Sequence, residues 1–297
     1  MSELIKRLKK AELISPPKWL LENVHYAVYT GSVAYGASND TSDMDIYGFA
    51  IPPKDDMFPH LRGDIPGFGK QKHRFAQWQE HHVVDKNHRK EYDFSVYSIV
   101  KYFDLCMMNN PNMVDTLFVP QRCVLHCTAI GQLVRDNRKM FLHKGAYHKF
   151  RGYAYAQLSK IGKKTESANP KRQASINAYG YDVKFAYHVV RLALECEQIL
   201  IECDLDIEQN REVLKAIRRG EWSLEKLKRW FDEKESALEN LYTASDLRHK
   251  PDEGKIKDLL LNCIEMHYGS VSNAITRNDD TSTLVKHLDS ILDRYRT

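Results

Sequence analysis

One short stretch of this chain, residues 31–49 (GSVAYGASNDTSDMDIYGF), constrains what it can fold into more than any other. A β-branched and aromatic run, residues 24–30, precedes it, and an apolar run, residues 46–51, closes it. Asp43 and Asp45 lie just before that second run. Because alternate residues of a strand point to the same face, their side chains project together. The sequence therefore predicts two strands joined by a Gly-Ser turn and a polar loop, with paired carboxylates entering the second strand.

The two carboxylates indicate a bound cation. They repel each other, so folding them together costs free energy unless a positive charge lies between them. Mg²⁺ is the expected ion and Mn²⁺ the alternative, although Asp-x-Asp is also common in solvated turns. Gly31 lets the backbone approach a ligand, and backbone N–H groups at Ser32 can hold phosphate oxygens. A phosphate-binding turn followed by a carboxylate pair is typical of phosphoryl or nucleotidyl transfer.

These residues also resemble a known signature. The pattern is similar to the Gly-Ser…Asp-x-Asp motif of the DNA polymerase β-like nucleotidyltransferases, and most similar to the RNA-ligase-associated group of predicted bacterial and phage nucleotidyltransferases. The residues that carry the resemblance are Gly31-Ser32, Tyr35-Gly36, Ser38 and Ser42-Asp43-Met44-Asp45. The resemblance implies a polymerase β-like catalytic domain with a small mixed sheet.

The same resemblance implies a third carboxylate on a neighbouring strand. Residues 91–97 alternate polar and apolar side chains, so they predict a strand, and residues 98–108 predict the helix that follows it. Asp93 is the candidate for the third acid. Glu91, on the same face of that strand, is the reserve.

The composition changes beyond residues 120–121. Strand signals vanish from about residue 128 onward, and helical spacing dominates. The sequence therefore predicts an α+β chain, with a catalytic domain over residues 1–125 and an all-helical domain over residues 126–297. Helices are expected over residues 141–164, 181–200, 208–220, 224–241 and 255–268. Those from residue 208 onward show no chemistry and are predicted to be scaffold.

Two of the expected helices carry polar stripes. Lys160 lies in a stripe along residues 149–160, and the second stripe is formed by Lys184, His188 and Arg191. Three donors in line suit a triphosphate or an RNA backbone, whereas a satisfied core histidine is the alternative interpretation of His188. The segment DVKFAYHVVRL is similar to a Lys-x-x-x-His-x-x-Arg-Leu helix of the RNA-ligase-associated group. That resemblance implies that the second stripe faces the aspartates.

Residues 52–91 form the least regular part of the sequence. They are polar and contain His60, His73, His81, His82 and His88. The histidine spacings match no standard metal-ligand pattern, although a metal site remains one interpretation. A second interpretation is that the basic run over residues 69–74, followed by Phe75 and Trp78, holds phosphates and stacks a base. A solvated surface loop is the third interpretation and the favoured one.

Composition excludes several classes of protein. The chain has 297 residues, 42% of them hydrophobic, and a net charge of +4, which allows one large or two modest domains but not the basic surplus of a nucleic-acid coat. Six cysteines without CxxC pairs are expected to be reduced thiols. No apolar run approaches membrane-spanning length and the first residues lack a signal-peptide core, so a cytoplasmic protein without a membrane partner is predicted. The oligomeric state stays open.

Together these features predict a two-metal nucleotidyltransferase that moves an NMP from an NTP to an acceptor hydroxyl and releases pyrophosphate. The residues expected to be both catalytic and metal-binding are Asp43, Asp45 and Asp93. Those expected to bind the nucleotide are Gly31, Ser32, Ser42, Lys160, Lys184, His188 and Arg191. The association of the resembling group with RNA ligases implies an RNA 3′ end, such as that of a damaged tRNA, as acceptor. The alternatives are AMPylation of a protein, transfer to a small molecule, or an inactive nucleotide- or RNA-binding module.

Overall fold

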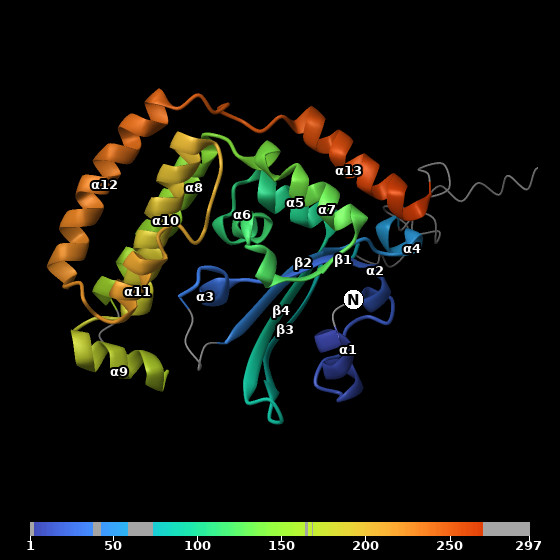
Figure 1. Cartoon of the computed structure of the whole chain (residues 1–297), viewed down its shortest axis with the longest axis horizontal. Helices are drawn as coiled ribbons and strands as arrows, with labels where there is room; N and C mark the ends of the chain where they lie inside the picture. The colour runs from blue at the N-terminus through green and yellow to red at the C-terminus, as the bar shows by residue number, and fades with distance from the viewer. Residues whose placement is uncertain (1–2, 38–42, 59–73, 164–165, 168, 270–297) are drawn as a thin grey trace, which may run out of the picture.

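The computed structural model of the chain describes residues 3–37, 43–58, 74–163, 166–167 and 169–269. A five-stranded sheet forms the N-terminal part, and a helical region arches over one side of it (Figure 1). The strands are β1 Val24–Tyr29, β2 Met44–Ala50, β3 Gln77–Asp85, β4 Lys90–Ser98 and β5 Val124–Cys127. Their order across the sheet is β3-β4-β2-β1-β5.

The sheet is mixed, and its register aligns the acidic residues of two strands. β1 pairs antiparallel with β2 and β5, and β3 pairs antiparallel with β4. β2 and β4 run parallel, with Asp45 opposite Asp93 and Ile46 opposite Phe94. The parallel pairing therefore places the predicted third carboxylate beside the Asp-x-Asp motif.

The helices divide between the two faces of the sheet. The N-terminal and connecting helices are α1 Glu3–Lys10, α2 Leu20–Asn23, α3 Gly31–Ala34, α4 Lys54–Met57, α5 Ile99–Met107, α6 Pro111–Phe118, η2 Gln121–Cys123, α7 Ala129–Asp136 and η3 Arg138–Phe141. The remaining helices are α8 Gly145–Lys163, α9 Pro170–Tyr179, α10 Val183–Glu202, α11 Arg211–Arg218, α12 Leu224–Ala244 and α13 Glu253–Tyr268. α10 packs against α8, α11 and α12, and α13 packs against α7 and α5 (Figure 1).

Alternation along β2 decides which face each side chain serves. Ile46 packs with Phe94 and the apolar side of α1 in a small cluster on one face. Phe49 belongs to the main core on the other face, which continues into the helical region through residues such as Phe150 and Ile199. Because successive residues of a strand alternate, Asp45 shares the face of Phe49 and is directed toward the helical region.

The predicted fold class is confirmed: an N-terminal mixed sheet is followed by a helical region. The proposed division at residue 125 stays a prediction, and β5 ends two residues beyond it, at Cys127. Among the described helices, none has the length and apolar character needed to cross a membrane. The cytoplasmic location remains a prediction.

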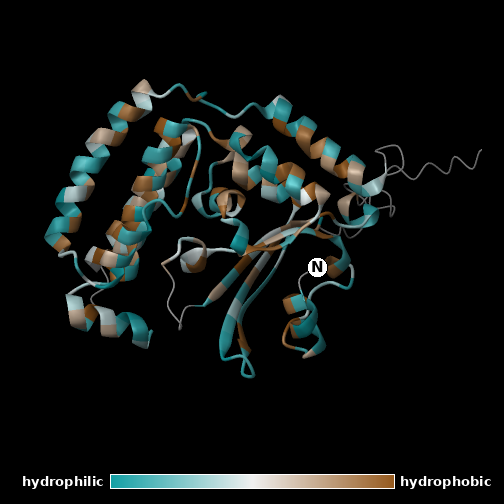
Figure 2. Ribbon diagram, viewed as in Figure 1, coloured by the Kyte–Doolittle hydropathy of each residue, from teal (hydrophilic) through white to brown (hydrophobic). Residues whose placement is uncertain are grey.

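Two elements differ from the sequence prediction. β3 lies inside the stretch expected to be irregular, because it is an edge strand with mostly solvated side chains and few apolar residues to mark it. Figure 2 shows that the tip of the β3–β4 hairpin is hydrophilic, whereas brown and teal residues alternate along α12 and α13. α9 was not expected, since it buries none of its residues and so lacks an apolar periodicity. The sequence also predicts an amphipathic segment over residues 282–296, and this segment lies outside the described residues.

Candidate active site

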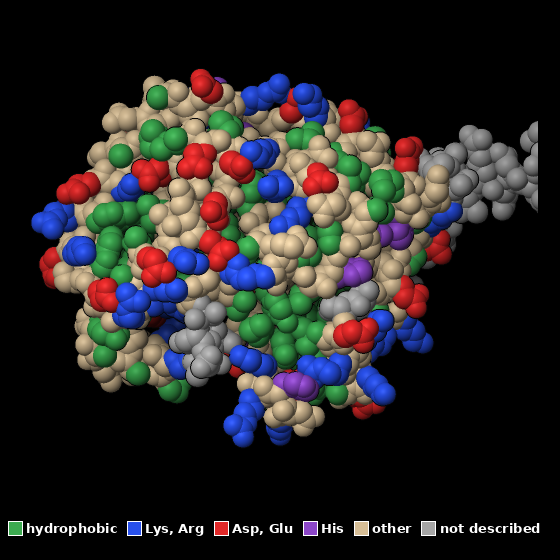
Figure 3. Space-filling model, viewed as in Figure 1, with side chains coloured by type: hydrophobic (Ala, Val, Ile, Leu, Met, Phe, Trp, Pro, Cys, Tyr) green, Lys and Arg blue, Asp and Glu red, His purple; other side chains and the backbone are tan. Residues whose placement is uncertain are grey.

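A cleft of about 890 Å³ lies between the sheet and the helical region. The predicted residues Gly31, Ser32, Asp43, Asp45, Lys184, His188 and Arg191 all line it. Figure 3 shows Lys and Arg side chains gathered around the hollow beside α9 and α11. The fold therefore brings the Asp-x-Asp motif and the polar stripe of α10 together, although they are far apart in the sequence.

Asp45 is the most perturbed acid of the cleft. Burial, together with the neighbouring carboxylates of Asp93 and Asp43, raises the pKa of Asp45 to about 6. Lys184, across the cleft, acts in the opposite direction on the same pKa. A partly buried carboxyl group between two others is reluctant to ionise, and a cation bound beside it would relieve that cost.

The backbone at position 31 and the nearby Asp45 carboxylate together require a glycine there. Its φ is +62°, a conformation that L side chains rarely adopt, and a Cβ at this position would lie 2.4 Å from Asp45 Oδ2. The preceding Thr30 N–H donates to the backbone oxygen of Asp45 at 2.9 Å. The Gly-Ser turn therefore lies directly against the carboxylate, and no other residue type fits position 31 without displacing it.

Asp93 receives its own support from a β-bulge in β3. The register of β3 against β4 shifts between Glu80 and Val83, and His82 has a φ of +57°. The His82 N–H donates to Asp93 Oδ1 at 2.7 Å, and His81 Nδ1 lies 3.5 Å from the same oxygen.

Glu91, the reserve for the third acid, lies two residues nearer the tip of the β3–β4 hairpin than Asp93. Its Oε1 is 2.6 Å from His82 Nδ1. The register favours Asp93, which is opposite Asp45, and the choice between the two acids stays a prediction.

The donor chemistry of this end of the sheet suits a hard divalent cation. Asp43 is half-exposed, and its Oδ1 lies 3.9 Å from Lys171 Nζ. In the described ranges, no group of three or more His, Cys, Asp or Glu side chains is gathered closely enough to hold a metal ion. The mutual influence of Asp43, Asp45 and Asp93 is nevertheless visible in the raised pKa of Asp45. Their carboxylate oxygens are ligands of the kind that Mg²⁺ or Mn²⁺ takes, and phosphate oxygens of a substrate would complete the coordination.

The first two turns of α10 carry two of the predicted nucleotide-binding residues. Asp182 caps this helix by accepting from the Lys184 N–H at 2.9 Å, so the Lys184 side chain lies at the cleft entrance. His188, one turn further, is largely buried. Burial, and then the charges of Arg191 and Lys184, hold the pKa of His188 well below its ordinary value. His188 is therefore neutral near pH 7 and can offer a hydrogen bond but not a charge.

Arg191 lines the cleft but is also held by buried acids, and its predicted contact with the nucleotide stays a prediction. Its side chain is only 4% exposed and forms a close ion pair with Asp115 Oδ2. It also donates to the Tyr35 hydroxyl, and Glu195 Oε1 lies 3.6 Å away. The charge of Arg191 is thus engaged by buried acids, because a cation at this depth requires such partners.

One predicted nucleotide-binding residue, Lys160, is absent from the described lining of the cleft. Lys160 is exposed on α8, with its Nζ 5.7 Å from the centre of the Phe185 ring. Ser42 lies outside the described residues, as does Ser38 of the motif. Of the histidine-rich stretch, His60 and His73 are also outside, whereas His81 and His82 lie beside the acids. The bulge that brings them there depends on strand pairing, which the sequence did not reveal.

The comparisons with known proteins agree with this geometry. A model of the RNA repair pathway DNA polymerase beta family matches residues 2–261. The chain belongs to this family. The family is one of the DNA polymerase β type and is associated with RNA repair.

Two further proteins are similar to this chain. An uncharacterized 38.9 kDa protein of enterobacteria phage T4, from the nrdC-mobD intergenic region, is 27% identical over 138 residues. That match spans 46% of this chain and 38% of the phage protein. The crystal structure of a nucleotidyltransferase-like protein from Exiguobacterium sibiricum superimposes with a TM-score of 0.27 at 9% identity, covering 80% of this chain and 73% of that one. So loose a superposition adds no argument.

Five cationic residues that the sequence did not assign to the site complete the lining of the cleft. They are Lys171 and Arg172 of α9 and Lys215, Arg218 and Arg219, which belong to α11 or follow it directly. Asn169 caps α9 by accepting from the N–H groups of its first turn, which places that pair of cations at the cleft. The prediction that α11 is only scaffold is therefore wrong. The spacing of its basic residues, three and then one apart, was the signal that could have revealed a cationic face.

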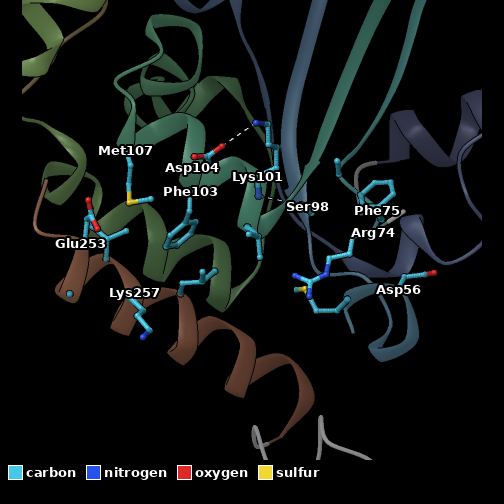
Figure 4. A pocket seen from close by; sticks show the side chains of 16 residues that line it. Asp56, Arg74, Phe75, Ser98, Lys101, Phe103, Asp104, Met107, Glu253 and Lys257 are labelled. Carbon is cyan, nitrogen blue, oxygen red and sulfur yellow. Dashed lines mark hydrogen bonds and ion pairs between the residues drawn. The ribbon is translucent and has the colours of Figure 1, made fainter. Parts of the chain in front are cut away.

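A second hollow, of about 660 Å³, lies apart from these residues. Figure 4 shows Phe103 and Met107 of α5 facing α13 across it, with Arg74, Lys101 and Lys257 around it. None of the residues expected to be catalytic, metal-binding or nucleotide-binding lines this pocket, although Arg74 and Phe75 from the alternative phosphate- and base-binding interpretation do. The charged cleft, not the apolar pocket, is the candidate active site.

Proposed function

We propose that this nucleotidyltransferase transfers an NMP from an NTP to an acceptor hydroxyl with the help of Mg²⁺, and that the acceptor is an RNA 3′ end such as that of a tRNA. The observation that carries the proposal is the opposition of charges in one cleft. Asp43 and Asp45, with Asp93 in register beside them, face a wall of lysine and arginine side chains. Carboxylates for cations opposite cations for phosphates are what the transfer of a charged nucleotide requires.

The carboxylates would hold the divalent cations and orient the substrate phosphates. Asp43 and Asp45 provide the oxygen ligands, and Asp93 adds the third carboxylate. A divalent cation bound there lowers the pKa of the attacking hydroxyl and neutralises charge on the phosphates. Gly31, which has no side chain, leaves the space beside Asp45 Oδ2 clear for this arrangement.

The helical wall would receive the phosphates of the NTP. The acceptor oxygen forms a bond to the α-phosphorus, the bond from that phosphorus to the bridging oxygen breaks, and pyrophosphate leaves. Lys184 and Arg172 are placed to neutralise the charge on the departing group, and Lys171 lies close to Asp43 at the cleft edge. His188, which is neutral, would donate a hydrogen bond to a phosphate oxygen.

RNA is favoured as acceptor for two reasons. The family to which the chain belongs is associated with RNA repair. The cleft also continues along α9 and α11, where Lys215 and Arg219 add charge and Tyr179 is 43% exposed. Exposed aromatic rings beside cations suit the bases and phosphates of a single-stranded end. A protein hydroxyl or a small molecule as acceptor is an alternative outcome of the test below.

The test offers competing acceptors to one enzyme. The pure protein is incubated with Mg²⁺ and each α-³²P-labelled NTP in turn, with total tRNA and total cell protein present together. We expect label in RNA, and none when Asp43→Asn and Asp45→Asn are combined. Asp258→Asn, which removes an exposed carboxylate of α13, is the matched control and should label as well as the wild type.

Each departure from this result has a meaning. Labelling that persists in the double variant would show that the active site lies elsewhere. Label found in protein alone would exclude RNA as acceptor while leaving nucleotidyl transfer intact. Absence of transfer with every NTP and acceptor would favour a nucleotide-binding module without catalysis.

A further inference from the structure

The turn that carries the Gly-Ser motif is bound by an arginine of α11. Arg218 donates a close hydrogen bond from Nη1 to the backbone oxygen of Ala37, the last described residue of the turn. Its guanidinium also lies 5.1 Å from the centre of the Tyr187 ring, which fixes its orientation against α10. An arginine of the helical region therefore reaches the catalytic loop of the sheet region.

A second arginine binds the middle of the same turn. Arg191 of α10 donates to the Tyr35 hydroxyl, and its guanidinium carbon lies 4.8 Å from the centre of the Tyr35 ring. The Tyr35 hydroxyl in turn donates to Asp115 Oδ2, which also pairs with Arg191. Tyr35, Arg191 and Asp115 are each at least 96% buried, so their positions are tightly determined.

A third arginine binds the turn from the side of η2. Arg122 donates from Nη2 to the backbone oxygen of Val33 at 3.2 Å, and its Nη1 lies 2.6 Å from Glu208 Oε2, just before α11. Gly36 has a φ of +63°, and a Cβ there would lie 2.9 Å from Glu208 Oε1. The turn therefore passes directly beneath the segment that leads into α11.

The turn has little to hold it in place by itself. α3 is only four residues long, and its closing hydrogen bonds are Tyr35 N to Gly31 O at 3.3 Å, Gly36 N to Val33 O at 3.3 Å and Ala37 N to Ser32 O at 2.9 Å. So short a helix is unstable without tertiary contacts. Its first residue, Gly31, lies against Asp45 Oδ2, so any shift of the turn moves the surroundings of that carboxylate.

We propose that Arg218 and Arg191 are positioning residues that hold the Gly-Ser turn against Asp45, so that the helical region sets the geometry of the catalytic carboxylates. Figure 1 shows α3 between the sheet and α11, as this role requires. The proposal rests on the proposed function in one respect, namely that Asp45 belongs to the active site. Small displacements of catalytic groups reduce rates strongly, so release of the turn would lower kcat rather than only substrate affinity.

The competing explanation is that Arg218 merely adds charge to the cleft. Arg219, the next residue, provides the matched control, because it also lines the cleft but pairs with Glu221 instead of the turn. Hydrogen exchange of the Tyr35, Gly36 and Ala37 amides in the full chain then reports the turn directly. We expect exchange about tenfold faster or more in Arg218→Gln, and unchanged exchange in Arg219→Gln.

Steady-state kinetics also distinguishes a positioning role of Arg218 from a purely electrostatic one. Arg218→Gln should lower kcat about tenfold with a smaller change in KM, whereas Arg219→Gln should act mainly on KM. Equal exchange in the two variants, or a purely KM effect in both, would overturn the proposal. If the wild type transfers no nucleotide, the proposed function fails, but the exchange comparison still decides whether the arginine holds the turn.

The Arg191 contact needs a gentler variant, because removing Arg191 would leave Asp115 and Glu195 unpaired in the core. Tyr35→Phe removes only the hydroxyl that Arg191 and Asp115 share. Tyr187→Phe is its control, since the Tyr187 hydroxyl is buried and has no hydrogen-bond partner among the described residues. We expect faster exchange of the turn in Tyr35→Phe alone. Equal exchange in both tyrosine variants would remove Arg191 from the proposal.

Discussion

Two hollows in the described part of the molecule have comparable size and opposite chemistry. The cleft, of about 890 Å³, is lined by Asp43, Asp45 and the basic residues of α9, α10 and α11. The pocket, of about 660 Å³, is lined chiefly by apolar side chains of α5 and α13, such as Phe103 and Ile256 (Figure 4).

The two hollows differ in how their residues affect the stability of the folded state. Phe103 is 1% exposed and belongs to the main core, so its burial favours the folded state. Asp45 is the opposite case, because its raised pKa means that ionisation is harder in the folded protein than in the unfolded chain. Functional sites commonly carry such a cost in stability. If this holds here, substitutions in the pocket should destabilise the protein, whereas removal of Asp45 should stabilise it.

The largest expected effect is on stability, at the pocket. Phe103→Ala should lower the free energy of unfolding by about 3–5 kcal/mol, because it removes a buried ring from the main core. Urea unfolding measures the loss, and nucleotidyl transfer per folded molecule should be unchanged. A strong loss of specific activity in the folded fraction would show that the pocket belongs to the site after all.

The next variant lies in the cleft, and it should stabilise the folded protein instead of destabilising it. Asp45→Asn should raise the free energy of unfolding by about 2 kcal/mol near pH 8 in EDTA, because it removes an ionised carboxylate that the folded state disfavours. The folded pKa is about 6 and the ordinary value 3.8, so the gain should shrink as the pH falls through 6 and vanish below about 4. Urea unfolding at several pH values checks this.

The effect of Mg²⁺ on stability tests the role of Asp45 without any measurement of activity. It should stabilise the wild type near pH 8, where Asp45 is ionised, and have little effect on Asp45→Asn. A gain from Asp45→Asn that does not depend on pH, or equal stabilisation of both proteins by Mg²⁺, would contradict the assignment of Asp45 as a metal-binding carboxylate.

Two lysine variants, one in each hollow, test whether a positive charge affects activity only in the cleft. Lys184→Ala should lower kcat/KM by about 10- to 100-fold, since it removes a charge-assisted contact with the substrate. Lys257→Ala removes the same charge from the pocket lining and should leave kcat/KM within about twofold. Steady-state kinetics with saturating Mg²⁺ measures both values of kcat/KM. A similar loss of kcat/KM in both variants would mean only that net charge attracts the substrate.

The smallest expected effect concerns acid stability under α13. His25 Nε2 lies 3.0 Å from His267 Nδ1, and burial, then His267 and His126, lower the pKa of His25 to about 4. The folded state thus binds this proton less tightly than the unfolded chain does. The resulting stability is complete above pH 6.5 and is lost as the pH falls toward 4.

His25→Gln removes that titration while keeping a polar side chain. Between about pH 7 and pH 5, the wild type should lose roughly 1 kcal/mol more unfolding free energy than the variant does. Thermal or urea unfolding across this range measures the difference. Parallel curves for the two proteins would show that the histidine pair does not influence folding.

Local patterns in the sequence were enough to predict many of the residues that the fold gathers in the cleft. The alternation around Asp45 and the glycine at position 31 follow from strand geometry and from the space a ligand needs, and both depend on near neighbours in the chain. The helical spacing of Lys184, His188 and Arg191 was equally local. The reaction class could therefore be predicted from the sequence, and the family match agrees with it.

Tertiary structure decided what those residues do to one another. Strand register put Asp93 beside Asp45, and an edge-strand bulge brought His81 and His82 to the same place. Burial paired Arg191 with Asp115 at the floor of the cleft, and packing made α11 a wall of the cleft. These outcomes depend on which distant segments meet and how much water remains between them, and a one-dimensional pattern contains neither quantity.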